Sequence, residues 1–198
     1  MNYGVLIPAF QPDEGLVALC RTLTEKNIPI IVVNDGSTEG TEYFQQLQQD
    51  GITVLGYAEN RGKGYALKTG IKYMQKAGFE GAVTADADGQ HTVADILRIA
   101  GKMEECPGCL VLGARDVEQM IPRSKAGNRL TRTLFRILHG IDLQDTQTGL
   151  RGIPLDTHTV PMLLNLPGDR YEYEMEMLLR SQDLFPSGVI EIPIETIY

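Results

Sequence analysis

Short apolar runs alternate along the chain with longer segments whose apolar residues recur at helical spacing. The runs are rich in β-branched residues and short enough to be strands buried in a parallel sheet. They occupy residues 4–8, 28–34, 52–57, 81–85 and 109–114. The resulting β-α-β-α-β-α-β-α-β order predicts an α/β fold with a mostly parallel central sheet flanked by helices.

Helix signals are clear in three of the intervening segments. The first begins after Asp13, a plausible N-cap, and the second ends before Gly78. The third opens with Thr92 and Asp95, which resemble a capping box with Asp in place of the usual Glu. The residues expected to face the core are Leu16, Val17, Leu19, Cys20 and Leu23, then Leu67, Gly70, Ile71 and Met74, and finally Val93, Ile96, Leu97, Ala100 and Met103.

The alternation of apolar runs and helical segments changes after residue 114, but no Pro-, Gly- or Ser-rich spacer marks a boundary between domains. We therefore expect a single domain over 1–198, in which a second half at 115–198 packs on the same sheet as the first half at 1–114. The segments of the second half are a basic helix at 124–140, DTQTGLRG at 145–152, a helix around 171–181 and a strand at 189–197.

Composition then narrows the class of protein. The net charge is −8, the sequence pI is about 4.9, and the basic residues are scattered except around 123–136, which argues against general nucleic-acid binding. No stretch reaches the roughly 18 apolar residues of a membrane span. The N-terminus lacks the basic start and long apolar middle of a signal peptide. A cytoplasmic protein is expected.

The cysteines are Cys20, Cys106 and Cys109, an odd number that suits a reducing compartment. CPGC at 106–109 lacks the second ligand pair of a zinc site. It also runs into a predicted strand, whereas a redox motif begins a helix. A structural role is therefore expected for this pair.

Two carboxylates stand one residue apart in TADADGQH at 84–91, directly after a predicted strand. Asp86 and Asp88 would point the same way from an extended segment. They would lie at the carboxyl end of a parallel strand, where open α/β sheets bind ligands. Oxygen ligands select Mg²⁺ or Mn²⁺, and Gln90 could supply a third oxygen. Alternatively, one Asp is a turn residue and the other a helix cap.

Two further strand ends carry candidate chemistry. Asp35 ends VVND and could accept hydrogen bonds from a base or a ribose. Gly62 and Gly64 flank Lys63 at a helix entry, where backbone N–H groups and a cation could face phosphates. A P-loop and a G-x-G-x-x-G after the first strand are both missing, which weakens the NTPase and dehydrogenase alternatives.

Taken together and in this order, these motifs resemble the family 2 glycosyltransferases of the GT-A fold. The matching segments are IPAF at 7–10, VVNDGST at 32–38, ENRGKGYALKTG at 59–70 and TADADGQH at 84–91. Within that family, three more segments are similar to the polyprenyl-phosphate glycosyltransferases, whose relatives include dolichyl-phosphate mannose synthases. They are GAR at 113–115, PRSKAGNRLTR at 122–132 and DTQTGLRG at 145–152.

The resemblance covers nearly the whole chain. It implies that 1–114 is the nucleotide-sugar-binding half and 115–198 the acceptor-side half, and it implies an activity. It implies metal-dependent transfer of a hexose, with inversion, from a nucleotide-diphospho-sugar to an undecaprenyl- or dolichyl-type phosphate, with Mg²⁺ or Mn²⁺ as cofactor. It further implies work at the cytoplasmic face of a membrane in cell-envelope glycan synthesis, with a membrane segment or membrane partner outside this chain.

The resemblance also implies roles for single residues. Pro8, Ala9, Asp35, Gly62, Lys63 and Asp86 would bind the nucleotide-sugar, and Asp86, Asp88 and Gln90 would form the metal group. Arg115, Ser124 and Arg129 would meet the acceptor phosphate, with Arg151 a weaker candidate. Asp88 and Arg115 would be catalytic. His91 follows the Asp pair, and helix capping or packing is its expected use.

The chain departs from the family at two places. PAFQP puts Phe10, Gln11 and Pro12 where PAYNE is common, so early nucleoside contacts differ. Glu174 stands where relatives with hydroxyl acceptors carry a Glu-Asp pair as base, but here without the Asp. A phosphate acceptor is already ionised at pH 7 and needs no base.

Two alternatives to transfer onto a polyprenyl phosphate stay open. One is a family 2 glycosyltransferase that acts on a sugar hydroxyl in cell-surface polysaccharide synthesis, although the Q-x-x-R-W signature of processive synthases is absent because the chain has no Trp. The other is a non-catalytic nucleotide-sugar binding module. Such a module could lose the metal pair, so the presence of both Asp86 and Asp88 favours catalysis.

Overall fold

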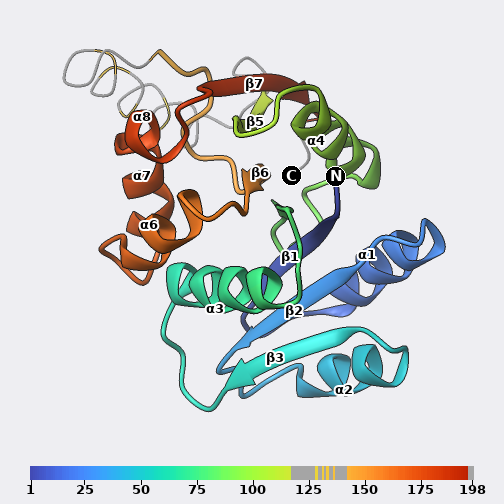
Figure 1. The fold of residues 1–198 in the computed structure, drawn as a ribbon. Coiled ribbons are helices and arrows are strands. Elements are labelled where there is room, and N and C mark those ends of the chain that lie inside the picture. The colour runs from blue at the N-terminus through green and yellow to red at the C-terminus, as the bar shows by residue number, and fades with distance from the viewer. Residues whose placement is uncertain (117–127, 129–130, 132, 134–135, 137–141, 196–198) are drawn as a thin grey trace.

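A seven-stranded sheet forms the centre of the computed structural model, which describes residues 1–116, 128, 131, 133, 136 and 142–195 (Figure 1). The strands are β1 (Tyr3–Ala9), β2 (Ile30–Asp35), β3 (Thr53–Tyr57), β4 (Gly81–Thr84), β5 (Leu110–Arg115), β6 (Arg151–Pro154) and β7 (Val189–Ile194). Their order across the sheet is β3-β2-β1-β4-β6-β5-β7. Every strand predicted from an apolar run is confirmed.

Strand β6 runs antiparallel to its neighbours β4 and β5, whereas the other paired strands are parallel. The sequence pattern does not predict this strand, because its four residues include Gly152 and Pro154, which weaken a strand signal. Its first residue, Arg151, pairs with Thr84 at the end of β4. The loop that precedes β6 therefore reaches the edge of the sheet where the parallel strands end.

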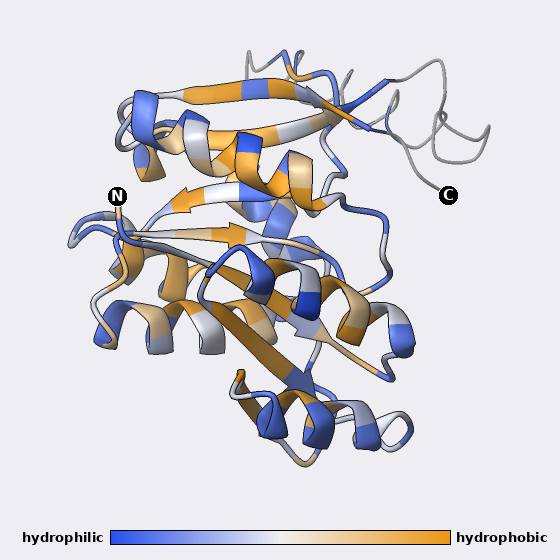
Figure 2. Cartoon of the chain, turned by 90° about the vertical axis from the view of Figure 1, so that its right-hand side faces the viewer, coloured by the Kyte–Doolittle hydropathy of each residue, from blue (hydrophilic) through white to orange (hydrophobic). Residues whose placement is uncertain are grey.

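Helices cover both faces of the sheet (Figure 1). They are α1 (Glu14–Glu25), α2 (Thr41–Gln49), α3 (Lys63–Lys76), α4 (Val93–Glu105), α6 (Thr159–Asn165), α7 (Glu172–Leu179) and α8 (Ser181–Leu184). Alternate residues of β1 face opposite layers: Val5 and Ile7 pack in a cluster with α1, α2 and α4, and Leu6 packs in a cluster with α3, α6 and α7. Figure 2 shows the strands as mostly hydrophobic, between helices with polar outer sides.

Both predicted helix starts are confirmed. Asp13 caps α1, with its Oδ1 accepting a hydrogen bond from the Gly15 N–H at 2.8 Å. Thr92 caps α4: its Oγ1 accepts from the Asp95 N–H at 3.1 Å and donates to Asp95 Oδ2 at 2.9 Å. Asp95, one methylene shorter than Glu, thus bonds the hydroxyl of the cap, whereas the acid of a standard capping box bonds the backbone N–H of the cap. The predicted helix around 171–181 is also present, as α7 and α8.

The predicted basic helix at 124–140 lies largely outside the described residues. Asn128, Thr131, Thr133 and Arg136 are described and are helical. At the other end of α4, Cys106 and Cys109, the pair for which a structural role is expected, form a disulfide. The close approach follows from the turn after α4, in which the Cys109 N–H donates to the Cys106 carbonyl at 3.1 Å.

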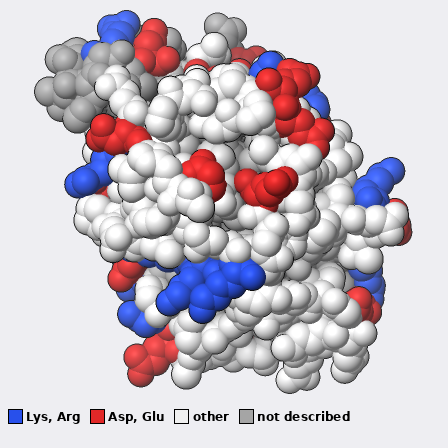
Figure 3. Space-filling view, viewed as in Figure 1, with Lys and Arg blue, Asp and Glu red and all other residues white. Residues whose placement is uncertain are grey.

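Charged side chains of both signs are interspersed on the face of the molecule seen in Figure 3, with uncharged surface between the groups. Among the described residues, no helix is long and apolar enough to cross a bilayer. The polar groups that can bind a ligand are concentrated instead at one edge of the sheet.

Candidate active site

A cavity of about 630 Å³ lies at the carboxyl ends of β1, β2 and β4. It is lined by Pro8, Ala9, Phe10, Gln11, Pro12, Asp13, Asp35, Asn60, Gly62, Lys63, Asp86, Ala87, Asp88, Arg170 and Tyr171. All the residues predicted to bind the nucleotide-sugar are in this lining, as is Asp88. This is the edge of a parallel sheet at which α/β proteins bind nucleotides.

Arg170 and Tyr171 are cavity residues that the sequence patterns do not indicate. They come from the turn before α7, far along the chain from the donor motifs, and folding brings this turn against the start of α3. A Cβ on Gly62 would lie 2.5 Å from the carbonyl oxygen of Asp169, so Gly is needed there for close approach. Tyr171 is 78% exposed and borders the cavity.

Asp35 ends β2, and its buried carboxylate organises the loop that leads into α3. It accepts hydrogen bonds from the Tyr57 hydroxyl at 2.7 Å, the Arg61 N–H at 2.8 Å and the Gly62 N–H at 3.0 Å. Burial and this hydrogen bond from its hydroxyl raise the pKa of Tyr57 well above its usual range. Asp35 therefore fixes the glycine-rich loop as well as bordering the cavity.

Lys63 begins α3 and points between two carboxylates. Its Nζ lies 2.6 Å from Oδ1 of Asp86 and 2.8 Å from Oε2 of Glu174. Burial by itself lowers the pKa of Lys63, but the charges of Glu174 and Asp86 outweigh burial and raise it. Lys63 is thus held as a cation at the wall of the cavity.

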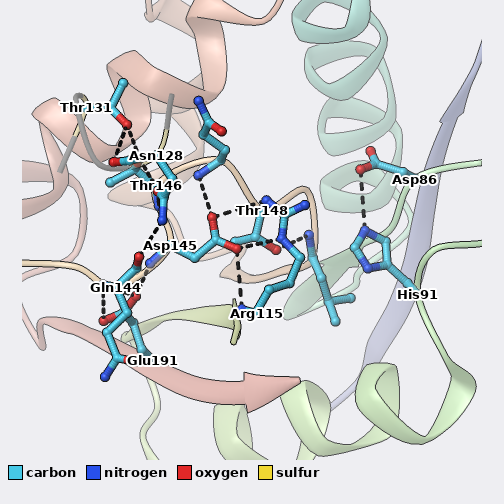
Figure 4. Close-up of polar contacts among 12 residues, drawn as sticks. Asp86, His91, Arg115, Asn128, Thr131, Gln144, Asp145, Thr146, Thr148 and Glu191 are labelled. Carbon is cyan, nitrogen blue, oxygen red and sulfur yellow. Dashed lines mark hydrogen bonds and ion pairs between the residues drawn. The ribbon is translucent and has the colours of Figure 1, made fainter. Parts of the chain in front are cut away.

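The Asp86 carboxylate is held on its other side by His91. Nε2 of His91 lies 3.4 Å from Oδ2 of Asp86, while Nδ1 of His91 is buried without a hydrogen-bond partner in the described structure (Figure 4). Burial disfavours the charged carboxylate, but the His91 hydrogen bond and the Lys63 charge outweigh it, so the pKa of Asp86 lies well below its usual value. His91 is therefore part of the site, a role for which the sequence offered only its position after the Asp pair.

Glu174 extends this chain of charges away from the cavity. Its Oε1 lies 3.6 Å from Nε of Arg151, and the backbone carbonyl of Glu174 accepts from Nη1 of Arg151 at 2.8 Å. Both side chains are buried. Charges of alternating sign therefore run from Arg151 through Glu174 and Lys63 to Asp86, and each buried charge has a partner of opposite sign.

Two carboxylates border the cavity where a divalent metal would sit. Asp86 and Asp88 both line the cavity and offer oxygen ligands, the donor set that Mg²⁺ and Mn²⁺ prefer. Asp88 also has a turn role, because its Oδ1 accepts from the Gln90 N–H at 3.1 Å. Gln90 does not line the cavity. In the described part of the chain, no cluster of three or more His, Cys, Asp or Glu side chains could hold a metal by itself. A metal here would need further oxygens, as from a diphosphate.

Arg115 ends β5 and is held by a fully buried carboxylate. Its Nε lies 2.7 Å and its Nη2 3.2 Å from the two oxygens of Asp145, a bidentate pair that fixes the plane of the guanidinium (Figure 4). Asp145 belongs to the DTQTG segment before β6. Ser124 and Arg129, the other predicted acceptor residues, lie outside the described residues.

At its C-terminal end, the same DTQTG segment reaches the Asp86 carboxylate. The carbonyl of Gly149 accepts from the Thr84 hydroxyl at 2.7 Å, and a Cβ on Gly149 would lie 2.6 Å from Oδ1 of Asp86. One loop therefore contacts Arg115 through Asp145 and touches Asp86 at Gly149.

Comparison with known proteins agrees with this geometry. Residues 5–161 match the model of the family described as glycosyl transferase family 2. The chain is 27% identical over 215 residues to the UDP-N-acetylglucosamine–dolichyl-phosphate N-acetylglucosaminyltransferase of Methanococcus voltae, which spans 98% of this chain and 85% of that protein. It is 26% identical over 205 residues to the undecaprenyl-phosphate mannosyltransferase of Micrococcus luteus, which spans 98% of this chain and 83% of the relative.

A solved structure shares the fold. The glucosyl-3-phosphoglycerate synthase of Mycobacterium tuberculosis, in complex with Mn²⁺, UDP-glucose and phosphoglyceric acid, superposes with a TM-score of 0.73 at 19% identity, over 98% of this chain and 70% of that one. The match of the family model over most of the sequence and the shared GT-A architecture lead to one conclusion: the chain belongs to glycosyltransferase family 2.

Proposed function

We propose that this glycosyltransferase transfers a sugar, with inversion and with the help of Mg²⁺ or Mn²⁺, from a nucleotide-diphospho-sugar to a polyprenyl phosphate. The observation that carries the choice of acceptor is the state of Glu174. By the family resemblance, this residue would stand where relatives with hydroxyl acceptors carry their base. Here its carboxylate is buried and engaged by both Lys63 and Arg151. Both of its oxygens face cations and the residue does not line the cavity, so it is not placed to take a proton from an acceptor there, and the site suits an acceptor that is already ionised.

The donor would lie in the cavity with its nucleoside toward Pro8, Ala9 and Asp35. Its diphosphate would then meet the Gly62 backbone and Lys63 at the start of α3, where a cation and helix N–H groups favour negative charge. Asp86 and Asp88 would hold the metal. When bound, the metal neutralises charge on the diphosphate oxygens.

In the reaction, an oxygen of the acceptor phosphate forms a bond to the anomeric carbon as the bond from that carbon to the β-phosphate oxygen breaks. The electron pair of the broken bond stays on the nucleoside diphosphate, whose growing charge faces Lys63. Arg115, fixed in orientation by Asp145, would grip the acceptor phosphate so that its oxygen approaches opposite the leaving group. Ser124 and Arg129 are proposed as further acceptor contacts.

The relatives support this acceptor class. The Methanococcus voltae and Micrococcus luteus proteins are named for dolichyl phosphate and undecaprenyl phosphate, and they match nearly the whole chain. Because such acceptors reside in membranes, we propose that the enzyme works at the cytoplasmic face of a membrane, held there by a segment or partner other than the described helices.

Transfer to matched acceptors tests the proposal. The protein is incubated with Mg²⁺ or Mn²⁺, a labelled UDP-, GDP- or TDP-sugar, and either a short-chain polyprenyl phosphate or the corresponding free polyprenol. The expected product is a lipid-linked sugar phosphate that forms only with the phosphate. Transfer to the alcohol or to a sugar hydroxyl, with none to the phosphate, would overturn the choice of acceptor. Donor binding without transfer to any acceptor would favour a binding module.

A further inference from the structure

Arg115 owes its orientation to Asp145, and Asp145 is itself held by the backbone around it. The two carboxylate oxygens of Asp145 accept the Arg115 side chain, and Oδ1 also accepts the Gln147 N–H at 3.0 Å. Asp145 is 0% exposed, so it has no freedom to follow a displaced partner. Whatever fixes the backbone of Gln144 and Asp145 therefore also fixes Arg115.

Glu191, on the last strand β7, supplies that support from one side. Its carboxylate accepts the Gln144 N–H at 2.8 and 2.9 Å and the Asp145 N–H at 3.0 Å (Figure 4). Glu191 is paired across the sheet with Leu112 of β5, the strand that ends at Arg115. The Glu191 side chain thus connects β7 to the backbone of Gln144 and of Asp145, the residue that holds Arg115.

Asn128 supplies support from the other side. Its Nδ2 donates to the Gln144 carbonyl at 2.7 Å, and its Oδ1 accepts the Thr146 N–H at 3.0 Å. Hydrogen bonds with Glu191 on β7 and with the buried Asn128 amide therefore hold the backbone on both sides of Asp145. Of these two supports, Glu191 is the one suited to substitution, because its side chain is only partly buried, whereas Asn128 is 1% exposed.

We propose that Glu191 is a positioning residue for transfer: it fixes the Gln144–Asp145 backbone, and through Asp145 it sets the guanidinium of Arg115 for the acceptor phosphate. The role assigned to Arg115 rests on the proposed function. Glu191 touches neither the cavity nor the reacting atoms, so it acts only through geometry. Its loss lets the Asp145 loop shift, and a displacement of about 1 Å at a group that aligns a reactant is enough to lower the rate substantially.

Two substitutions test this role at different strengths. In Glu191→Gln, an amide NH₂ must face the Gln144 N–H in either orientation of the amide, because both carboxylate oxygens accept that N–H. Glu191→Ala removes the acceptor altogether. The matched control is Glu195→Gln, the same change at an exposed residue just beyond β7.

The kinetic readout separates positioning from general damage. We expect the KM for a short-chain polyprenyl phosphate to rise roughly tenfold in both Glu191 variants. The KM for the nucleotide-sugar should stay within about twofold, and the control should match the parent protein. Equal increases in both KM values, or a donor KM that rises with a falling Tm, would reduce Glu191 to a general structural role and overturn the proposal.

A spectroscopic measurement tests the position of Arg115 independently of which acceptor the enzyme uses. The Arg115 Nε–H resonance, identified by its loss in Arg115→Lys, should shift in Glu191→Gln and Glu191→Ala but not in Glu195→Gln. An Arg115 signal that does not move in either Glu191 variant overturns the positioning role. If the parent protein transfers no sugar to polyprenyl phosphates, the proposed function fails, while a shifted Arg115 signal still establishes that Glu191 positions this guanidinium.

Discussion

Glu174 forms an ion pair of 2.8 Å with Lys63 that joins helices α7 and α3 beside the cavity. The same ammonium contacts Asp86 at 2.6 Å, so Lys63 is shared between a carboxylate at the cavity and one behind it. Burying such charges costs free energy that only good geometry and mutual pairing offset. The arrangement therefore indicates that the position of the Lys63 cation matters for the site.

Glu174→Gln tests whether this carboxylate positions Lys63 or takes a proton. We expect the donor KM to rise and kcat/KM to fall about tenfold, with an unchanged shape of the pH–rate profile, because Lys63 keeps Asp86 as a partner. The lost charged contact should lower stability by roughly 1.5–3 kcal/mol. Glu176→Gln is the matched control on the same helix, since Glu176 pairs with exposed Arg180 at 3.3 Å. Abolished transfer together with loss of the acidic limb of the profile would instead mark Glu174 as a base.

Asp88→Asn tests the metal role. Its carboxylate lines the cavity, so the variant should lose Mg²⁺- or Mn²⁺-dependent transfer by a factor of about a thousand or more, as expected when several kcal/mol of charge stabilisation disappear. Chelation of the metal in the parent protein should have the same effect. Asp50→Asn, at the opposite edge of the sheet, serves as control and should retain activity. Full metal-dependent activity in Asp88→Asn would exclude this carboxylate as a ligand.

Gly149→Ala tests the contact between the loop before β6 and Asp86. The new methyl group would lie 2.6 Å from Oδ1 of Asp86, closer than real carbon–oxygen contacts, so the carboxylate or the loop must move. We expect transfer to fall at least tenfold. Gly101→Ala is the control: nothing lies within 4 Å of its added methyl group on α4, so it should keep activity and gain about 0.5–1 kcal/mol of stability. Equal activity of the two variants would show that the Asp86 contact is unimportant.

The reactivity and ionisation of the Cys20 thiol report on the burial of the core beneath α1. Burial raises the pKa of its thiol from 9.0 to about 12. The folded protein therefore keeps this proton at pH values where the unfolded chain has lost it, and the thiol's contribution to stability is complete below pH 9 and is lost as the pH rises toward 12.

Thiol reagents at pH 8 should leave native Cys20 unmodified and should react with it after unfolding in guanidinium. Unfolding free energies measured between pH 9 and pH 11 should fall less steeply in Cys20→Ala than in the parent protein. Rapid modification of the folded protein at Cys20 would contradict the burial of this residue.

The donor side of the site can be predicted from sequence because its residues directly follow apolar runs. Asp35 and Asp86 stand at the ends of such runs and Lys63 at a glycine-flanked helix start, so local pattern alone brings them to one edge of a parallel sheet. The folded core follows from the same signals, since each apolar run forms the strand that its length and β-branched content predict.

The partners of these residues cannot be predicted in this way. The local pattern of YEYEMEML does not show that Glu174, rather than Glu172 or Glu176, meets Lys63, because that choice depends on how α7 packs against α3. Asp145 lies 30 residues from Arg115 and is identified as its partner only by the folded loop. Strand β6 escapes prediction because it is short and contains Gly and Pro, and with it the antiparallel step at the centre of the sheet.

The antiparallel strand β6 joins the N-terminal and C-terminal parts of the chain within one sheet. Strand β5 falls within the first half, 1–114 with Arg115, that the sequence predicts, yet in the sheet it pairs with β6 and β7, and β6 lies between it and β4. A cut near residue 114 would therefore leave β4 with an open edge and β5 without neighbours. A C-terminal block exchanged between relatives would therefore have to bring strands that re-form the pairings of β6 with β4 and β5 and of β7 with β5.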